Sequence, residues 1–196
     1  MPEKKLNQQV DFFGHTKKNK INMKVIIING SSRVGKDQFA NFFKAHYGYK
    51  SVNWSTIDKV KKISKRNFGW NGKKTEEARL FLSEIKRVWT EFNNGPFVDM
   101  TNKITNHFLK LDKKEQQNMI YFIHCREPHE IQKFVDKYGE DCITLLLKRE
   151  DRTVPNNESD KNVANFNYDF TIDNNGNKED LKSQSLEFIK TLTKKQ

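Results

Sequence analysis

Two hydrophobic periods alternate along the chain. Short runs of adjacent apolar residues, rich in β-branched and aromatic types, predict strands at about 25–28, 51–54, 119–124, 142–148 and 168–172. Apolar residues at three- and four-residue spacing predict six helices. One begins at residue 38, the next covers about 58–67, and a third follows Thr75. A fourth ends at about Leu111, and the last two cover about 128–138 and 178–192. Strands that alternate with helices favour a parallel sheet covered on both faces. The pattern therefore predicts a three-layer α/β/α fold with a five-stranded, mostly parallel sheet.

The helix expected after Thr75 carries a broad apolar stripe. Thr75 can cap its first turn, where two glutamates favour the positive end of the helix. Six apolar residues then recur at helical spacing: Phe81, Leu82, Ile85, Val88, Trp89 and Phe92. We interpret this stripe as core packing and not as a stacking platform for a ligand. Asn94-Gly95-Pro96 breaks the pattern and predicts the end of that helix.

A glycine-rich loop follows the first predicted strand directly. Gly30, Gly35 and Lys36 stand at the spacing G-x-x-x-x-G-K, between a predicted strand and a predicted helix. Glycines let the backbone curl so that successive N–H groups face one concavity, and the helix end and the lysine add positive charge. We therefore expect this segment to bind a nucleotide through Gly30, Ser31, Ser32, Arg33, Val34, Gly35, Lys36, Asp37 and Gln38.

Asp37 departs from the usual form of this loop. The residue after the lysine is normally Ser or Thr, whose hydroxyl ligates Mg²⁺. A carboxylate is also an oxygen ligand for Mg²⁺, although it is longer and charged. We expect Asp37 to contribute to a metal site.

Charged residues follow three further strands. Asp58 and Lys61 come after the strand at 51–54, Arg126 and Glu127 after 119–124, and Arg149 and Arg152 after 142–148. The carboxyl ends of parallel strands share one edge of a sheet, so these side chains should converge on the glycine-rich loop. Such convergence suits phosphoryl transfer, in which two polyanions are held in line and the migrating charge is neutralised.

Most of residues 23–192 resemble phage-type deoxynucleoside monophosphate kinases. S-x-x-D-x-V-K at 55–61 is similar to their S-x-x-D-P-[LV]-K element, with Lys59 in place of proline. R-E-P-H-E-I at 126–131 resembles their D-x-R-x-x-x-E segment, and F-G-W-N-G-K-K at 68–74, followed by Arg79 and Ser83, resembles further bacterial and phage relatives. Y-D-F-T-I-D-N-N-G at 168–176 is similar to an ending shared with dephospho-coenzyme A kinases.

The resemblance implies a P-loop kinase that uses ATP and Mg²⁺ to phosphorylate a (deoxy)nucleoside monophosphate. It implies acceptor-binding helices at about 58–111 and a lid at about 149–166. The catalytic residues would be Lys36, Asp58, Arg126 and Arg152. Arg149, Asn175 and Gly176 would join the loop in binding ATP, and the acceptor would contact Asp58, Lys61, Arg79, Arg126 and Glu127. Asp37 and Glu127 would hold the metal.

His124 stands where that family has an acid two residues before Arg126. Neutral imidazole is a poor ligand for Mg²⁺. Either Asp37 and Glu127 hold the ion, or the chain is an inactive relative. Two other functions therefore stay open: a dephospho-coenzyme A-like small-molecule kinase, in which Asp58 deprotonates a ribose hydroxyl, and a nucleotide-binding protein without catalysis.

Composition bounds the remaining classes. The 196 residues suit one domain, which we place at 23–196. Residues 1–22 are either a polar and flexible extension or the consequence of an upstream start codon. No run approaches a membrane span or the apolar core of a signal peptide, and the two cysteines suggest reduced thiols, so we expect a cytoplasmic protein. The net charge of +11 lies largely in scattered lysines, which argues against a nucleic-acid partner. The sequence leaves monomer and homodimer open.

Overall fold

The computed structural model describes residues 23–44, 49–150, 163 and 165–194. A five-stranded sheet in the order β2-β3-β1-β4-β5 forms the middle layer, and every neighbouring pair of strands is parallel. The strands are β1 (Lys24–Asn29), β2 (Lys50–Ser55), β3 (Met119–His124), β4 (Cys142–Lys148) and β5 (Phe170–Asp173). The predicted fold class is confirmed, and the sheet is wholly parallel.

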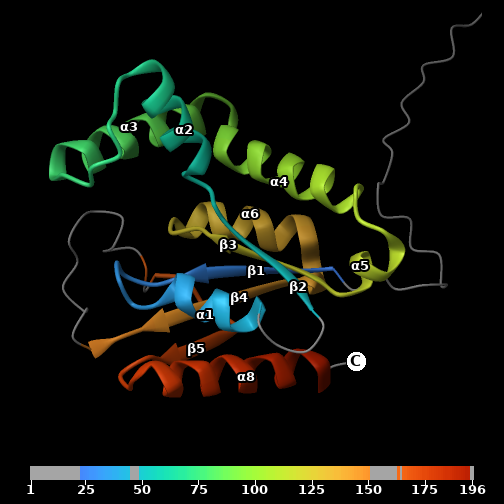
Figure 1. Ribbon diagram of the computed structural model, residues 1–196. Helices are drawn as coiled ribbons and strands as arrows, with labels where there is room; N and C mark the ends of the chain where they lie inside the picture. Colours follow the sequence, from blue (N-terminus) through green and yellow to red (C-terminus); the bar gives the residue numbers. More distant parts are fainter. Residues whose placement is uncertain (1–22, 45–48, 151–162, 164, 195–196) are drawn as a thin grey trace, which may run out of the picture.

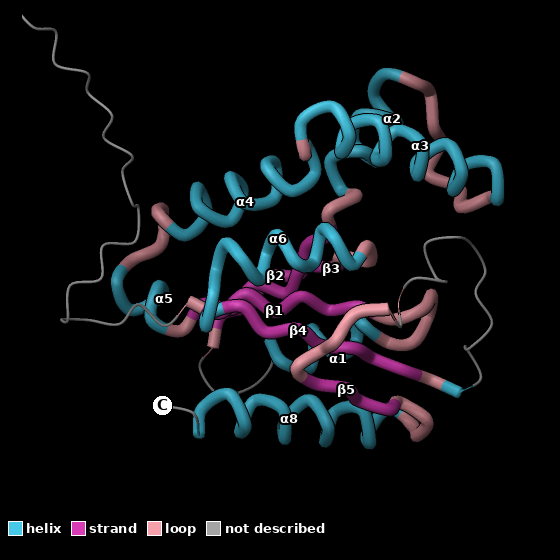
Figure 2. Tube along the Cα trace, turned by 180° about the vertical axis from the view of Figure 1, so that it is seen from behind, coloured by secondary structure: helices cyan, strands magenta, loops and turns pink. Residues whose placement is uncertain are grey.

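Helices cover both faces of the sheet (Figures 1 and 2). On one face lie α1 (Lys36–Lys44) and α8 (Lys178–Lys194), which contribute Phe39, Phe43, Leu181 and Phe188 to the core. On the other face lie α4 (Gly95–Phe108) and α6 (Pro128–Tyr138), and α4 also packs against α2 (Asp58–Asn67) and α3 (Glu76–Asn93). Two short elements that the sequence pattern did not predict are α5 (Lys113–Gln117) and the 3₁₀ helix η1 (Gly139–Asp141).

The sheet alternates its buried side chains between these two faces. Val25, Ile27, Tyr121 and Ile123 face α4 and α6, whereas their neighbours in the same strands face α1 and α8. A central strand buried on both sides must be apolar at every position, as β1 and β3 nearly are. The polar exceptions are Lys24 at the start of β1 and Asn29 and His124 at the carboxyl ends of β1 and β3.

The interpretation of the α3 stripe as core is wrong for part of that stripe. Leu82 is buried, but the side chains of Val88 and Phe92 are 55% and 81% exposed. The helix packs against α2 and α4 away from the sheet, so these neighbours cover only one side of a wide apolar arc. The expected ends of this helix are confirmed: Thr75 accepts a hydrogen bond from the Ala78 N–H, and Asn94 terminates the helix in the left-handed region.

Other boundaries shift by one or two residues. The first helix begins at Lys36 and not at 38, and the last strand lies at 170–173 and not at 168–172. Most of the expected lid at 149–166, including Arg152, and the extension at 1–22 lie outside the described residues. No helix in the described part of the chain is long and apolar enough to cross a membrane.

Candidate functional site

The glycine-rich loop leaves the carboxyl end of β1, the central strand, and enters α1 at Lys36. Gly30 and Gly35 adopt φ angles of 138° and 97°, which disfavour any residue with a Cβ. A Cβ on Gly30 would also collide with the carbonyl oxygen of Leu147, and one on Gly35 would lie 2.8 Å from Asn174 Nδ2. Arg33 has a φ of 65°, a strained value that recurs at functional sites. The loop conformation therefore requires both glycines.

The Lys36 ammonium closes this loop on itself. Its Nζ donates hydrogen bonds of 2.6 Å to the carbonyl oxygens of both Gly30 and Ser31. The amine thus lies beside the loop backbone at Gly30 and Ser31. A phosphate bound by the loop N–H groups would meet a full positive charge there.

Asn29, which the sequence reasoning missed, anchors the start of the loop. This residue is fully buried, and its Oδ1 accepts a 2.8 Å hydrogen bond from the Gly30 N–H. Its Nδ2 donates to the Arg126 carbonyl at 3.1 Å and to the Tyr168 hydroxyl at 2.6 Å. The Tyr168 hydroxyl in turn donates to the Val163 carbonyl at 2.8 Å. A polar residue at the end of a purely apolar strand was the available signal.

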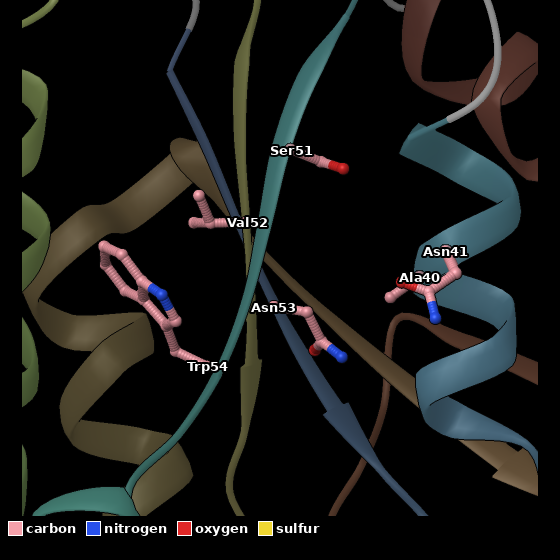
Figure 3. A pocket seen from close by; sticks show the side chains of 6 residues that line it. All are labelled: Ala40, Asn41, Ser51, Val52, Asn53 and Trp54. Atoms are coloured by element: carbon pink, nitrogen blue, oxygen red, sulfur yellow. The ribbon is translucent and has the colours of Figure 1, made fainter.

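Asp37 lies in the first turn of α1 beside two polar side chains of the sheet. Its Oδ1 accepts a 2.9 Å hydrogen bond from Asn53 Nδ2 and lies 3.4 Å from His124 Nε2. The Asp37 side chain is 84% exposed, whereas that of His124 is 15% exposed. Figure 3 shows Asn53 on the same side of β2 as Ala40 and Asn41 of α1, lining an open hollow of about 280 Å³, with Val52 and Trp54 on the opposite side.

His124 is neutral near pH 7. Burial lowers its pKa to about 4, the charge of Lys36 acts in the same direction, and Asp37 opposes both. The imidazole Nε2 lies 2.6 Å from Asn53 Oδ1, an atom that can only accept, so this nitrogen carries the proton.

Asp58 begins α2 close to the same point. Its Oδ2 accepts a 2.8 Å hydrogen bond from the Ser55 N–H, and its Oδ1 lies 3.8 Å from Lys61 Nζ. The charges of Asp58 and Lys61 both act on His124. The structure thus brings residues from α1, α2 and β3 together at the carboxyl edge of the sheet: Lys36, Asp37, Asp58, Lys61 and His124.

Arg126 and Glu127 follow β3. The Arg126 carbonyl is held by Asn29, and its side chain is partly buried. Glu127 is the residue before α6. The pKa of the buried Cys125 thiol is raised well above its usual value, chiefly by burial, and the charge of Glu127 acts in the same direction.

Four further predicted residues have different surroundings. Arg149 directly follows β4, and Asn175 Oδ1 accepts a 2.9 Å hydrogen bond from the Glu150 N–H next to it. Gly176 precedes α8, where a Cβ would collide with Asp180. Arg79 lies near the start of α3, and no contact among the described residues joins it to the phosphate loop.

No family model matches this chain, and no curated protein matches it. Several solved structures are similar to it at low identity. They include shikimate kinase from Aquifex aeolicus, with 12% identity and a TM-score of 0.46 over 85% of this chain and 96% of that one. Dephospho-CoA kinase from Campylobacter jejuni has 15% identity and a TM-score of 0.43 over 87% and 98% of the two chains. The APS kinase CysC of Mycobacterium tuberculosis in complex with AMPPNP and APS has 10% identity and a TM-score of 0.44 over 87% and 97%.

These three proteins are kinases, but likenesses of this size identify neither a family nor a substrate for the chain. What this chain can do therefore depends on its own site. A buried ion pair joins two helices on one face of the sheet: Lys86 Nζ of α3 lies 2.5 Å from Glu130 Oε2 of α6, and Thr90 Oγ1 donates to Glu130 Oε1 at 3.2 Å. The contacts of Glu130 join α6 to α3, and this long-range role could not be predicted from the sequence.

Proposed function

We propose that this protein transfers the γ-phosphoryl group of ATP to a (deoxy)nucleoside monophosphate, giving ADP and the diphosphate. The observation that carries the proposal is the conformation of the phosphate loop. Gly30 and Gly35 have positive φ angles, and the Lys36 Nζ is hydrogen-bonded to the loop backbone. Charged residues of α1 and α2 surround His124 at the same edge of the sheet. A loop of this kind binds the phosphates, and the neighbouring charges can bind a second, acceptor phosphate.

Lys36 supports the donor half of this reaction. Its ammonium donates hydrogen bonds to two loop carbonyls. On binding, the same group would turn to the β- and γ-phosphates and stabilise the charge that builds up on the leaving oxygen.

Asp37 fits a role in holding Mg²⁺. Mg²⁺ is commonly bound by one or two carboxylates together with phosphate oxygens and water, and Asp37 offers an exposed carboxylate at the loop. Neutral His124 adds no positive charge that would repel the ion. When bound, the ion would neutralise charge on the transferring phosphoryl group. Glu127, the residue before α6, is the second carboxylate that the sequence offers as a ligand.

Asp58, Lys61 and Arg126 support the acceptor half. Asp58 is hydrogen-bonded to the Ser55 N–H and lies near Lys61, an arrangement that suits a fixed carboxylate which orients an acceptor. An acceptor phosphate is already an anion, so its attack on the γ-phosphorus needs no general base. Arg126 offers a planar fork for that phosphate.

One observation favours a second candidate, a nucleotide-binding protein without catalysis. The residue at the end of β3 is a neutral imidazole instead of an acid. Such a protein would bind ATP through the same loop but would not turn it over.

An assay of ADP release separates these functions. Purified protein with ATP and Mg²⁺ is tested against each ribo- and deoxyribonucleoside monophosphate and against dephospho-coenzyme A, beside Lys36→Ala protein. We expect turnover with at least one monophosphate and none with the variant. ATP binding without turnover would support the non-catalytic function, and turnover with dephospho-coenzyme A alone would replace the proposed acceptor.

A further inference from the structure

One hydrogen-bonded chain joins the two positions at which this site departs from the common phosphate-loop pattern. In that pattern a hydroxyl residue after the loop lysine and an acid at a strand end hold Mg²⁺. Here the acid is Asp37 on the helix, and the strand-end residue is His124. Asn53, on the neighbouring strand β2, contacts both.

The geometry fixes the orientation of the Asn53 amide. An amide donates only through its nitrogen and accepts only through its oxygen. Nδ2 lies 2.9 Å from the Asp37 carboxylate, and Oδ1 lies 2.6 Å from His124 Nε2. The reverse orientation would set Oδ1 against a carboxylate, so Asp37 selects this arrangement, and His124 Nε2 donates its proton to Oδ1.

Asn53 also has a firm base. It pairs in register with Phe122 of β3, which is fully buried, and His124 continues the same strand. Asp37, in contrast, is held mainly by its helix and extends into solvent with 84% of its side chain exposed. An exposed carboxylate samples several rotamers unless a neighbour restrains it. The restraint here comes from the rigid sheet and reaches the carboxylate through Asn53.

We propose that Asn53 is a positioning residue, which together with His124 holds the Asp37 carboxylate in the orientation that receives the Mg²⁺ of MgATP. This inference rests on the proposed function and deepens it. The acid of this site, Asp37, stands on a helix, whereas in the common pattern the acid stands at the end of a strand. Asn53 and His124 connect the Asp37 carboxylate to the sheet. Groups that orient a metal ligand from outside the coordination shell typically change metal affinity by about 10–100-fold when removed.

The test measures metal-dependent nucleotide binding and not turnover. A fluorescent, non-hydrolysable ATP analogue is titrated with Mg²⁺ present and with EDTA, and the ratio of the two dissociation constants gives the contribution of the metal. Asn53→Leu is compared with wild type and with Asn41→Leu, a matched control that lines the same hollow from α1. We expect the ratio to fall by about tenfold or more in Asn53→Leu and to stay unchanged in Asn41→Leu. The dissociation constant in EDTA should not change in either variant.

An exchange variant gives an independent answer if Asn53→Leu folds poorly. Asp37→Ser should lose metal-dependent binding, and the double variant Asp37→Ser with His124→Asp, which restores the common arrangement and keeps Asn53, should recover it. A folded Asn53→Leu protein with the wild-type ratio, or a double variant no better than Asp37→Ser, would overturn the inference. If one of these results is found while wild type binds the analogue and turns over ATP, only this inference fails and the proposed function stands. Failure of wild type to bind the analogue would overturn both.

Discussion

The side-chain amide of Asn174 donates a 2.9 Å hydrogen bond to the backbone carbonyl of Val34. Both residues are buried, and they lie 140 positions apart in the sequence. The Asn174 N–H also donates to the Lys148 carbonyl at 2.8 Å, so the turn after β5 is fixed to the end of β4. This turn therefore supports the phosphate loop from the side opposite Asn53, in the space that Gly35 leaves free by lacking a Cβ.

Asn174→Ala should destabilise the protein and weaken nucleotide binding together. The substitution leaves the buried Val34 carbonyl without its donor, which costs about 1–3 kcal/mol of unfolding free energy. Asn174→Asp keeps the shape but replaces the donor with a carboxylate, so its loss should be larger. Urea unfolding and ATP titration measure the two effects, with Thr171→Ala on the exposed side of β5 as control. Equal stability of Asn174→Ala and the control would show that the bond contributes little.

Lys36→Ala should abolish phosphoryl transfer and leave the fold intact. The Nζ contacts loop carbonyls at the surface of the phosphate site and not the hydrophobic core. Loss of a charged group that acts on the transition state costs on the order of 10²–10³ in rate or more. ADP release and far-UV circular dichroism measure the two properties. A well-folded Lys36→Ala protein with near-normal turnover would contradict the assignment of this loop.

Asp37→Asn should raise the Mg²⁺ concentration needed for half-maximal rate. The amide keeps the size of the side chain but loses the charge that attracts a divalent cation. Glu127→Gln is the matched comparison, since it removes the other carboxylate that the sequence offers as a ligand. The measurement is the rate against Mg²⁺ concentration at fixed ATP. If only Glu127→Gln raises the Mg²⁺ concentration needed for half-maximal rate, the metal ligand is Glu127, the residue before α6, and not Asp37.

The sequence predicted what is local in this fold. The strands at 119–124 and 142–148 and the helices at 58–67 and 128–138 have the predicted bounds, because apolar runs and helical spacing record burial directly. Asn29, Asn53 and Asn174 were missed, because each acts through bonds to residues distant in sequence. The exposed part of the α3 stripe was missed for a related reason: helical spacing marks an apolar face but not which neighbour covers it.

Lys86→Met should lower the unfolding free energy by about 3–5 kcal/mol, because it leaves the Glu130 carboxylate buried without its charged partner. A double variant in which Glu130 is also replaced by Met should recover most of this loss. Arg87→Met, at the adjacent exposed position of α3, removes ion pairs to Glu84 and Glu91 that water screens, and should cost much less. Urea unfolding measures all three. Similar losses of unfolding free energy in Lys86→Met and Arg87→Met would mean that the buried ion pair stabilises the fold no more than the exposed ion pairs do.

Arg126→Ala should reduce turnover far more than stability. The backbone of Arg126 is fixed by Asn29 at the carboxyl edge of the sheet, beside the phosphate loop, where its side chain can grip an acceptor phosphate with two hydrogen bonds. Loss of such a contact in the transition state should cost about 3–4 kcal/mol, or on the order of 10²–10³ in rate.

The alternative is a structural role for Arg126, through a salt bridge that stabilises the fold. Arg126→Lys separates the two roles, since it keeps the charge but loses the planar fork. Its rate should fall between those of wild type and Arg126→Ala, measured per folded molecule beside the melting temperature. If Arg126→Ala melts at a lower temperature yet keeps the wild-type rate per folded molecule, the residue is structural and the acceptor phosphate binds elsewhere.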